Sequence, residues 1–285
     1  MAAIATVTKV PKRAVHGIGN GLAQIGEQLS FYARVMGDVL FNFKIKWKYR
    51  SVVFNLVSDI TIGAGALIVG GGMVFVIFSM SFFTGTEVGL QGFKGLQQIG
   101  AEAFTGLIGS FANTREVTPL IAGVAFAAQV GAGFTAELGA MRISDEIDAL
   151  EVMSVPSIVY LVCTRLIASL VALLPLYMIS LFASFFASKL ITTQVLGLSP
   201  GIYDHYFHFY LPAIDIFYSI VKVTVFCILV VLIHCYYGYY ATGGPAGVGR
   251  AVGRAIRLSI IAIVVTNLIL SFVFWGTSNT VSLTG

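Results

Sequence analysis

The chain has 285 residues, of which 57% are hydrophobic and only 11% are charged. Soluble domains carry about 25% charged residues, so this deficit, together with a mean hydropathy of +0.90, excludes an ordinary soluble domain and indicates a multi-pass membrane protein. The net charge of +4 is small, and the basic residues form no aromatic-interleaved surface of the kind that binds nucleic acid. We therefore expect no nucleic-acid partner.

The start of the chain carries two segments of different character. Residues 1–21 are small, basic and glycine-rich, which predicts a flexible N-terminus. From residue 22 to residue 50, apolar side chains recur every three or four positions and charged residues occupy the intervening faces. This pattern predicts an amphipathic helix that lies in the membrane interface without crossing the bilayer. Lys44, Trp47 and Lys48 would anchor its end at the lipid headgroups.

Residues 51–285 are expected to form one all-α integral membrane domain. A bilayer core is crossed by roughly 20 apolar residues in a helix, and five stretches meet this requirement. Residues 81–98 are expected to be a polar outer connection, and residues 191–210 an aromatic outer loop. We place the spans at about 53–80, 99–134, 157–190, 212–236 and 258–276.

The most acidic stretch of the chain lies between the second and third spans. Five of the 13 acidic residues fall between Glu137 and Glu151. Unpaired charges of this density are too costly to bury in a membrane, so the pattern predicts a short amphipathic helix over about 137–153 at the membrane surface. Its expected use is contact with something soluble.

The distribution of basic residues predicts the orientation in the membrane. Eight of the 17 lie in residues 1–50, three more lie in residues 250–257, and Arg142 stands beside the acidic helix. The positive-inside rule then places the N-terminus and the acidic helix in the cytoplasm. Five spans leave the C-terminus outside.

Charged residues also interrupt the apolar stretches, at Arg115 and Glu116 in the second and at Lys222 in the fourth. Ionisable residues inside a membrane are costly and mark a pathway or a partner. With Asn267 in the fifth span, we hypothesise that they guide an anionic headgroup or close a gate by pairing. The alternative is static ion pairing that only fixes how the helices pack.

No catalytic arrangement of side chains emerges from the sequence. The glycine-rich stretch 243–249 lacks the lysine and serine or threonine that complete a phosphate-binding loop. Asp204, His205 and His208 have the spacing of metal ligands but no fourth ligand, so we expect no metal site. We therefore expect a protein that is not itself an enzyme and binds no cofactor.

Several motifs together resemble the MlaE/YrbE permease family. They are the run from Thr135 to Arg142, the run from Glu146 to Met153, and the block from Gly243 to Val252. The resemblance covers nearly the whole chain and assigns residues 51–285 to an MlaE-type permease domain. More narrowly, Phe31-Tyr32 and residues 203–207 are similar to the B-type permease half of an actinobacterial Mce lipid-transport system.

The resemblance implies an ABC-type lipid transporter in the plasma membrane that imports hydrophobic, fatty-acid-like lipids. It implies a paralogous A-type permease half, two copies of a cytoplasmic ATPase that uses ATP and Mg²⁺, and Mce-domain proteins that form a tunnel outside. The acidic segment would be the coupling helix that docks on the ATPase. The residues given this role are Glu137, Gly139, Met141, Arg142, Asp145, Glu146, Asp148, Leu150, Glu151 and Met153.

This sequence departs from the better-studied family pattern at Gln129, where that pattern has an arginine, and at Asn267, where it often has an aspartate.

Two other functions remain open. One is a self-sufficient secondary transporter driven by ions, although the odd number of spans and the lack of a visible inverted repeat weigh against it. The ions would pass by Asp59, Arg115, Glu116 and Lys222. The other is a non-transporting scaffold for an outer complex.

Overall fold

The computed structural model describes residues 12–41, 49–63 and 72–276. Every regular element in these ranges is a helix. Within them, five helical stretches are long and apolar enough to cross a membrane, so the predicted all-α fold with five spans is confirmed. These stretches are Gly72–Gln97, Glu102–Ile143, Val159–Val195, Ala213–Tyr239 and Gly244–Trp275.

Two of the five spans are built from several helical segments joined end to end. In the second span, π-helical turns η2 and η3 stand on either side of α7, and in the third span η4 and η5 flank α10. The second span consists of η1 (Glu102–Phe104), α6 (Thr105–Ala112), η2 (Asn113–Val117), α7 (Thr118–Phe126), η3 (Ala127–Gly131) and α8 (Ala132–Ile143). The others are α5 (Gly72–Gln97), then η4 (Val159–Cys163), α10 (Thr164–Leu190) and η5 (Ile191–Val195), then α12 (Ala213–Tyr239) and α13 (Gly244–Trp275).

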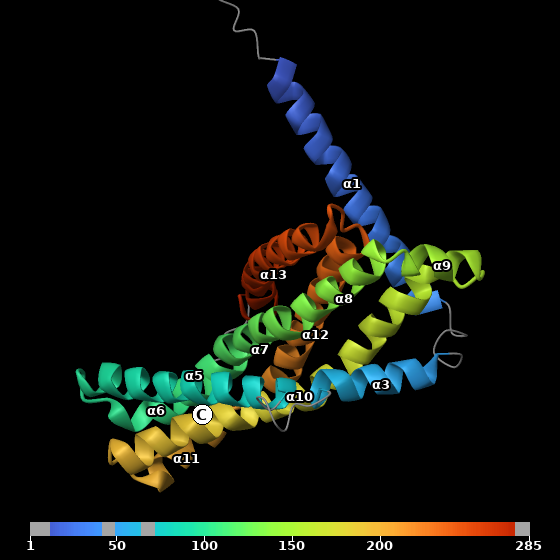
Figure 1. Ribbon diagram of the computed structural model, residues 1–285. Coiled ribbons are helices and arrows are strands. Elements are labelled where there is room, and N and C mark those ends of the chain that lie inside the picture. The colour runs from blue at the N-terminus through green and yellow to red at the C-terminus, as the bar shows by residue number, and fades with distance from the viewer. Residues whose placement is uncertain (1–11, 42–48, 64–71, 277–285) are drawn as a thin grey trace, which may run out of the picture.

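Helices outside the five spans lie at both ends of the molecule (Figure 1). α9 (Glu146–Val152) and α1 (Lys12–Phe41) are found at the end where α12 finishes and α13 begins, whereas α11 (Pro200–Phe209) is at the other end beside α6. The core runs between α7, α8, α10 and α12, where Phe126, Leu138, Leu173 and Phe226 are fully or almost fully buried. Each end of the bundle therefore carries helices that are not part of the five spans.

α1 corresponds to the predicted amphipathic helix, but it begins at Lys12, within the segment predicted to be flexible. Its second half packs on α12 and η4, and Phe31 and Val35 are buried there. The predicted headgroup anchors Lys44, Trp47 and Lys48 lie outside the described residues.

The first span differs from the predicted range of 53–80. α3 (Arg50–Thr61) is too short to cross a bilayer, and the span is α5, so residues 81–97 are transmembrane helix and not the predicted polar connection. The prediction is wrong because the glycines of this stretch allow close helix packing and do not mark a loop. In the structure, Gly85 and Gly89 face the neighbouring helix α10.

α5 and α10 approach closely along a row of small residues spaced four apart. Ser81 and Ser180 share a buried hydrogen bond between their hydroxyl oxygens at 2.6 Å. One turn on, a Cβ at Gly85 would collide with the Ser184 carbonyl oxygen, and a Cβ at Gly89 would lie 2.9 Å from the carbonyl oxygen of Ser188. Small residues allow this contact because helix association in lipid depends on van der Waals packing and interhelical hydrogen bonds.

Replacing Gly85 with alanine is expected to destabilise the protein by about 1–3 kcal/mol, since the new methyl group would force α5 away from the α10 backbone. Thermal unfolding of the detergent-solubilised chain, followed by circular dichroism, measures the change. Gly95→Ala is the matched control on the same helix, because no atom lies within 4 Å of a Cβ there. Equal melting temperatures for the two variants would contradict close packing at Gly85.

The predicted aromatic outer loop at 191–210 is largely helical, because η5 and α11 lie within it. Tyr203 and Phe207 on α11 form a small separate core with Phe93 of α5 and with Leu198. The Tyr203 hydroxyl donates a hydrogen bond to Ser188 Oγ, and burial raises the pKa of Tyr203 to about 12. The aromatic residues therefore hold this end of the fold together.

Candidate functional site

The acidic segment is divided between two helices, whereas the sequence predicts one helix over 137–153. α8 ends at Ile143, Asp145 takes the left-handed conformation with φ of 57°, and α9 runs from Glu146 to Val152. Aspartate tolerates this conformation better than most residues. The Ser144 hydroxyl donates to Glu146 Oε1 at 2.8 Å and supports the turn.

The two helices of this segment turn some of the assigned residues inward. Ile147 is fully buried, and Met141 and Leu150 pack partly against the main core. Gly139 is buried under α13, where a Cβ would lie 2.7 Å from Val248 Cγ1. Ile147 and Gly139 therefore fix the segment to the bundle, whereas Met141 and Leu150 are partly exposed.

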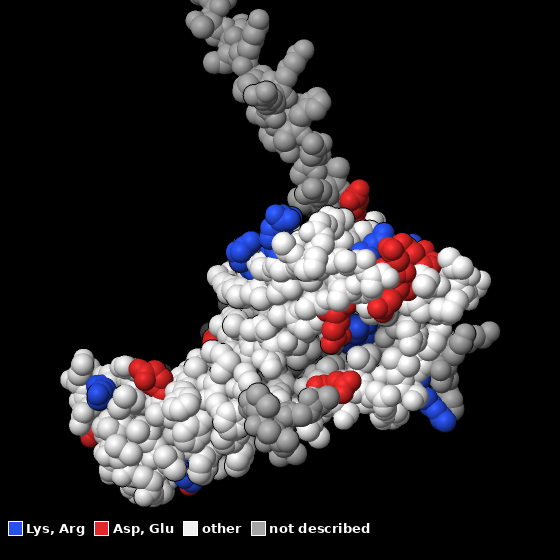
Figure 2. Space-filling view, viewed as in Figure 1, with Lys and Arg blue, Asp and Glu red and all other residues white. Residues whose placement is uncertain are grey.

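The outward face of the segment is acidic and apolar. Asp145, Glu146 and Asp148 are exposed, and Figure 2 shows acidic side chains gathered over this part of the molecule. Val152 and Met153 are also exposed, at 85% and 65%. A surface with negative charge beside exposed apolar side chains is suited to binding a basic, partly apolar partner.

Both ends of the segment are tied to the transmembrane helices. The Glu137 carboxylate pairs with Arg165 of α10 at 3.0 Å, and the Arg165 side chain is only 9% exposed. At the other end, Glu151 accepts hydrogen bonds from Ser157 at 2.7 Å and from Tyr239 of α12 at 3.3 Å. Direct side-chain contacts therefore join this segment to α10 and α12.

Arg142 and Asp148 form an ion pair at 2.6 Å across the turn between α8 and α9. Both side chains are partly exposed, so the pair stabilises the turn only modestly. The Arg142 side chain therefore makes its ion pair within the acidic segment. The Asp148 side chain is still 57% exposed, so its carboxylate remains accessible to a partner together with those of Asp145 and Glu146.

The second candidate site is a polar network between η2, α12 and α13, in which Asp215 and Lys222 are buried and the Glu116 side chain is 42% exposed. Arg115 of η2 donates from Nε to Asp215 Oδ2 at 2.8 Å, and its side chain is 14% exposed against 2% for Asp215. Trp275 Nε1 donates to the other carboxylate oxygen of Asp215 at 2.8 Å. The Arg115 guanidinium also lies 3.9 Å from the centre of the Phe111 ring, in cation–π contact.

Glu116, the next residue in η2, is the centre of the other half of the network. Lys222 of α12 is fully buried, and its Nζ lies 3.3 Å from Glu116 Oε1 and 2.6 Å from the Arg115 carbonyl oxygen. From α13, Ser271 Oγ donates to Glu116 Oε1 at 2.6 Å and Asn267 Nδ2 donates to Oε2 at 2.7 Å. The carboxylate thus joins three segments.

The structure brings together all four residues that the sequence suggested for the buried site: Arg115, Glu116, Lys222 and Asn267. Sequence reasoning missed Asp215, Ser271 and Trp275. A signal for Asp215 was available, because it lies seven positions before Lys222 and therefore on the same face of α12.

An apolar cavity of about 410 Å³ opens beside this network. Its walls come from α6 and α13, and Arg115 and Glu116 supply the charged part of its lining. The complete lining is Leu107, Ile108, Phe111, Ala112, Arg115, Glu116, Ser271 and Trp275.

The histidines considered as metal ligands do not form a cluster. Asp204 is paired with Lys189 at 2.8 Å, and the ring of His205 stacks on Phe209. Across the part of the chain that the structure describes, no group of three His, Cys, Asp or Glu side chains is placed to hold a metal ion.

Comparison with known proteins finds the same family along most of the chain. Residues 62–273 match the Permease MlaE family. A probable ABC transporter permease protein of Rickettsia prowazekii is 32% identical over 209 residues, which are 73% of this chain and 81% of that protein.

Two further relatives come from a cyanobacterium and a plant. A probable ABC transporter permease protein of Synechocystis is 32% identical over 199 residues, covering 70% of this chain and 76% of the relative. The chloroplastic protein TRIGALACTOSYLDIACYLGLYCEROL 1 of Arabidopsis thaliana is 31% identical over 195 residues, covering 68% and 56% of the two chains. The chain, with its five membrane-spanning helices, therefore belongs to the MlaE family and is a transmembrane permease of an ABC transporter.

Proposed function

We propose that this permease is one half of a transporter that moves hydrophobic lipids, powered by a separate ATPase. The observation that carries the proposal is the charged network of Arg115, Glu116 and Lys222 at the edge of an apolar cavity. Apolar walls with a few convergent polar groups suit a ligand with an acyl chain and a polar headgroup. The name of the Arabidopsis relative, which contains a galactolipid name, supports the same class of substrate.

The ATPase would dock on the outward face of the acidic segment, at Asp145, Glu146 and Asp148 and at the exposed Val152 and Met153. ATP and Mg²⁺ would be used by that partner. Closure of two ATPase copies would push on α9, and the links from Glu137 to Arg165 and from Glu151 to Tyr239 would carry the movement to α10 and α12.

The remaining partners follow from the resemblance to a B-type half of an Mce system. They are a paralogous A-type permease half, with which the chain would form a heterodimer, and Mce-domain proteins outside, with fatty-acid-like lipids imported into the plasma membrane. We place the N-terminus in the cytoplasm and the C-terminus outside, because exposed arginines at the start of α13 lie at the same end as α9 (Figure 1). These arginines are Arg250, Arg254 and Arg257.

Reconstitution of the complex purified from native membranes tests the proposal. We expect ATP-dependent movement of a fluorescent fatty acid between vesicles and the complex. The rate should be about tenfold lower for Glu116→Gln and Lys222→Met, since each change removes one charge of the ion pair and leaves the other uncompensated. Glu87→Gln, on the exposed side of α5, is the control and should transport normally. Uptake driven by an ion gradient without ATP would contradict the proposal.

A further inference from the structure

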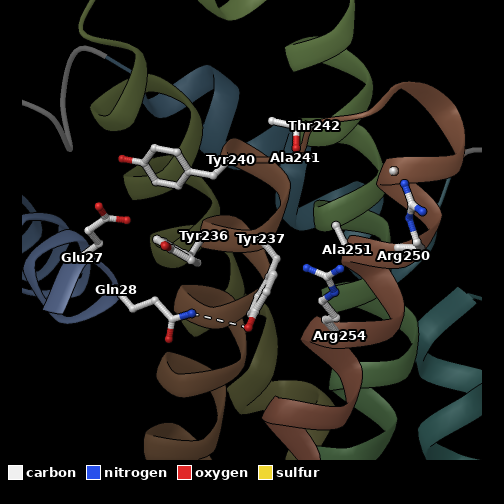
Figure 3. A pocket seen from close by; sticks show the side chains of 11 residues that line it. Glu27, Gln28, Tyr236, Tyr237, Tyr240, Ala241, Thr242, Arg250, Ala251 and Arg254 are labelled. Atoms are coloured by element: carbon white, nitrogen blue, oxygen red, sulfur yellow. Dashed lines mark hydrogen bonds between the residues drawn. The ribbon is translucent and has the colours of Figure 1, made fainter. Parts of the chain in front are cut away.

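A second cavity, of about 440 Å³, lies at the end of the bundle that carries α9, far along α12 from the polar network. It is enclosed by α1, by the last turn of α12 and the loop after it, and by the first turns of α13 (Figure 3). Its lining is Glu27, Gln28, Tyr236, Tyr237, Tyr240, Ala241, Thr242, Gly247, Arg250, Ala251 and Arg254.

Hydrogen-bond donors predominate along one side of this cavity. Arg250 and Arg254 stand one turn apart on α13, and Figure 3 shows them with Tyr237 beside Arg254. The amide of Gln28 donates to the Tyr237 hydroxyl oxygen at 3.4 Å, which leaves the hydroxyl proton of Tyr237 available to a ligand. Two guanidinium groups and a phenol thus line one cavity.

The charge of this wall is not balanced by the protein. The ion pairs formed among the described residues use Arg115, Arg142, Arg165, Lys189 and Lys222, and neither Arg250 nor Arg254 is in one of them. Glu27 is the one carboxylate in the lining, and it comes from α1 on the opposite wall (Figure 3). The cavity therefore offers two arginines to an anion from outside the chain.

The position of the cavity favours a phosphate group. It lies where α12 ends and α13 begins, at the depth where tyrosine rings collect at a membrane interface, and basic pockets between helices at this depth hold phosphate headgroups. Guanidinium groups bind phosphate through paired, charge-assisted hydrogen bonds. We propose that Arg250, Arg254 and Tyr237 form a phosphate-binding site, occupied by the headgroup of an anionic phospholipid or by a soluble phosphate ester. This site does not depend on the proposed transport of lipids through the other cavity.

Native mass spectrometry of the purified full chain tests the site, with phosphatidylglycerol as the probe. We expect the Arg250→Gln, Arg254→Gln double variant to bind phosphatidylglycerol about tenfold more weakly than the unaltered chain, because charge-assisted hydrogen bonds are lost. Arg257→Gln is the matched control, since Arg257 is exposed on the same helix but does not line the cavity, and it should change binding less than about twofold. Tyr237→Phe, which removes only one hydroxyl, should weaken binding to an intermediate degree.

Two competing ligands distinguish the source of the phosphate. Diacylglycerol with the same acyl chains should not compete, whereas competition by inorganic phosphate at the concentration of the lipid would identify a soluble phosphate ester as the occupant. Equal losses for Arg257→Gln and the double variant would overturn the proposal, because they would reveal only a diffuse attraction. The proposal would also be overturned if the double variant bound phosphatidylglycerol normally but no longer recovered an ATPase from membranes. The two arginines would then contact a partner protein and not a phosphate group.

Discussion

Replacing Asp215 with alanine is expected to destabilise the folded protein by about 3–5 kcal/mol, the cost of removing one member of a buried ion pair. The change leaves the guanidinium of Arg115 without this carboxylate and removes the acceptor of the Trp275 indole N–H. The side chains of Asp215 and Arg115 are 2% and 14% exposed, so water replaces the lost contacts poorly. Thermal unfolding in detergent, followed by the helical circular dichroism signal, measures the loss.

A double variant separates the ion pair from simple packing. Arg115→Met combined with Asp215→Leu removes both charges and keeps apolar volume, so it should be more stable than Asp215→Ala alone. Glu87→Ala, at an exposed position of α5, should melt like the unaltered protein. If Asp215→Ala melts at the same temperature as Glu87→Ala, the pair contributes little and the network is only a consequence of the helix arrangement.

Reversing the charges of Glu146 and Asp148 with lysine is expected to reduce the amount of ATPase that co-purifies with the permease by about tenfold or more. Both side chains lie on the exposed face of α9, so their replacement changes a partner's electrostatic contacts while Ile147 still packs underneath. The Asp148 change also removes the ion pair with Arg142, but this pair is partly exposed and stabilises the turn only modestly. Glu151 is left unchanged in this variant because Ser157 and Tyr239 already hold its carboxylate.

The control carries the same change in net charge at the other end of the molecule. The control variant combines Glu87→Lys, at an exposed position of α5, with Glu102→Lys, at a half-buried position of η1. It should leave recovery of the ATPase unchanged. Quantitative immunoblotting of complexes from native membranes gives the ratio of the two subunits. Normal recovery with the α9 variant would assign docking to another surface.

The number of spans and the polar residues within them could be predicted from the sequence, because each involves a large free-energy cost in a bilayer. A bilayer imposes a minimum length on apolar helices, and an ionisable residue such as Lys222 within one of them requires a partner. Arg115, Glu116, Lys222 and Asn267 were therefore recognisable before their contacts were known.

The missed features depend on contacts between distant parts of the chain. Gly85 resembles a loop residue until the carbonyl of Ser184 is beside it. Asp215 stands near the start of its span, where solvent is a plausible partner, and its pairing with Arg115 depends on how α12 packs against η2. The turn at Asp145 is hidden because apolar residues continue at helical spacing on both sides of it. The surface charge predicted for α9 is present, but the sequence alone does not reveal which of its residues point inward.

The π-helical turns on either side of α7 have a consequence for how the length of this protein varies between species. A π turn holds one residue more than an α turn, so it accommodates an inserted residue locally. The side chains of the helix that follows then keep their direction relative to the rest of the bundle. Loss of Gln129 from η3 would let the chain close as regular α-helix with α8 still aligned to α12. Loss of a residue from within α7 would instead rotate α8 and the acidic segment by about 100°. Natural one-residue length differences in this span are accordingly expected within η2 and η3.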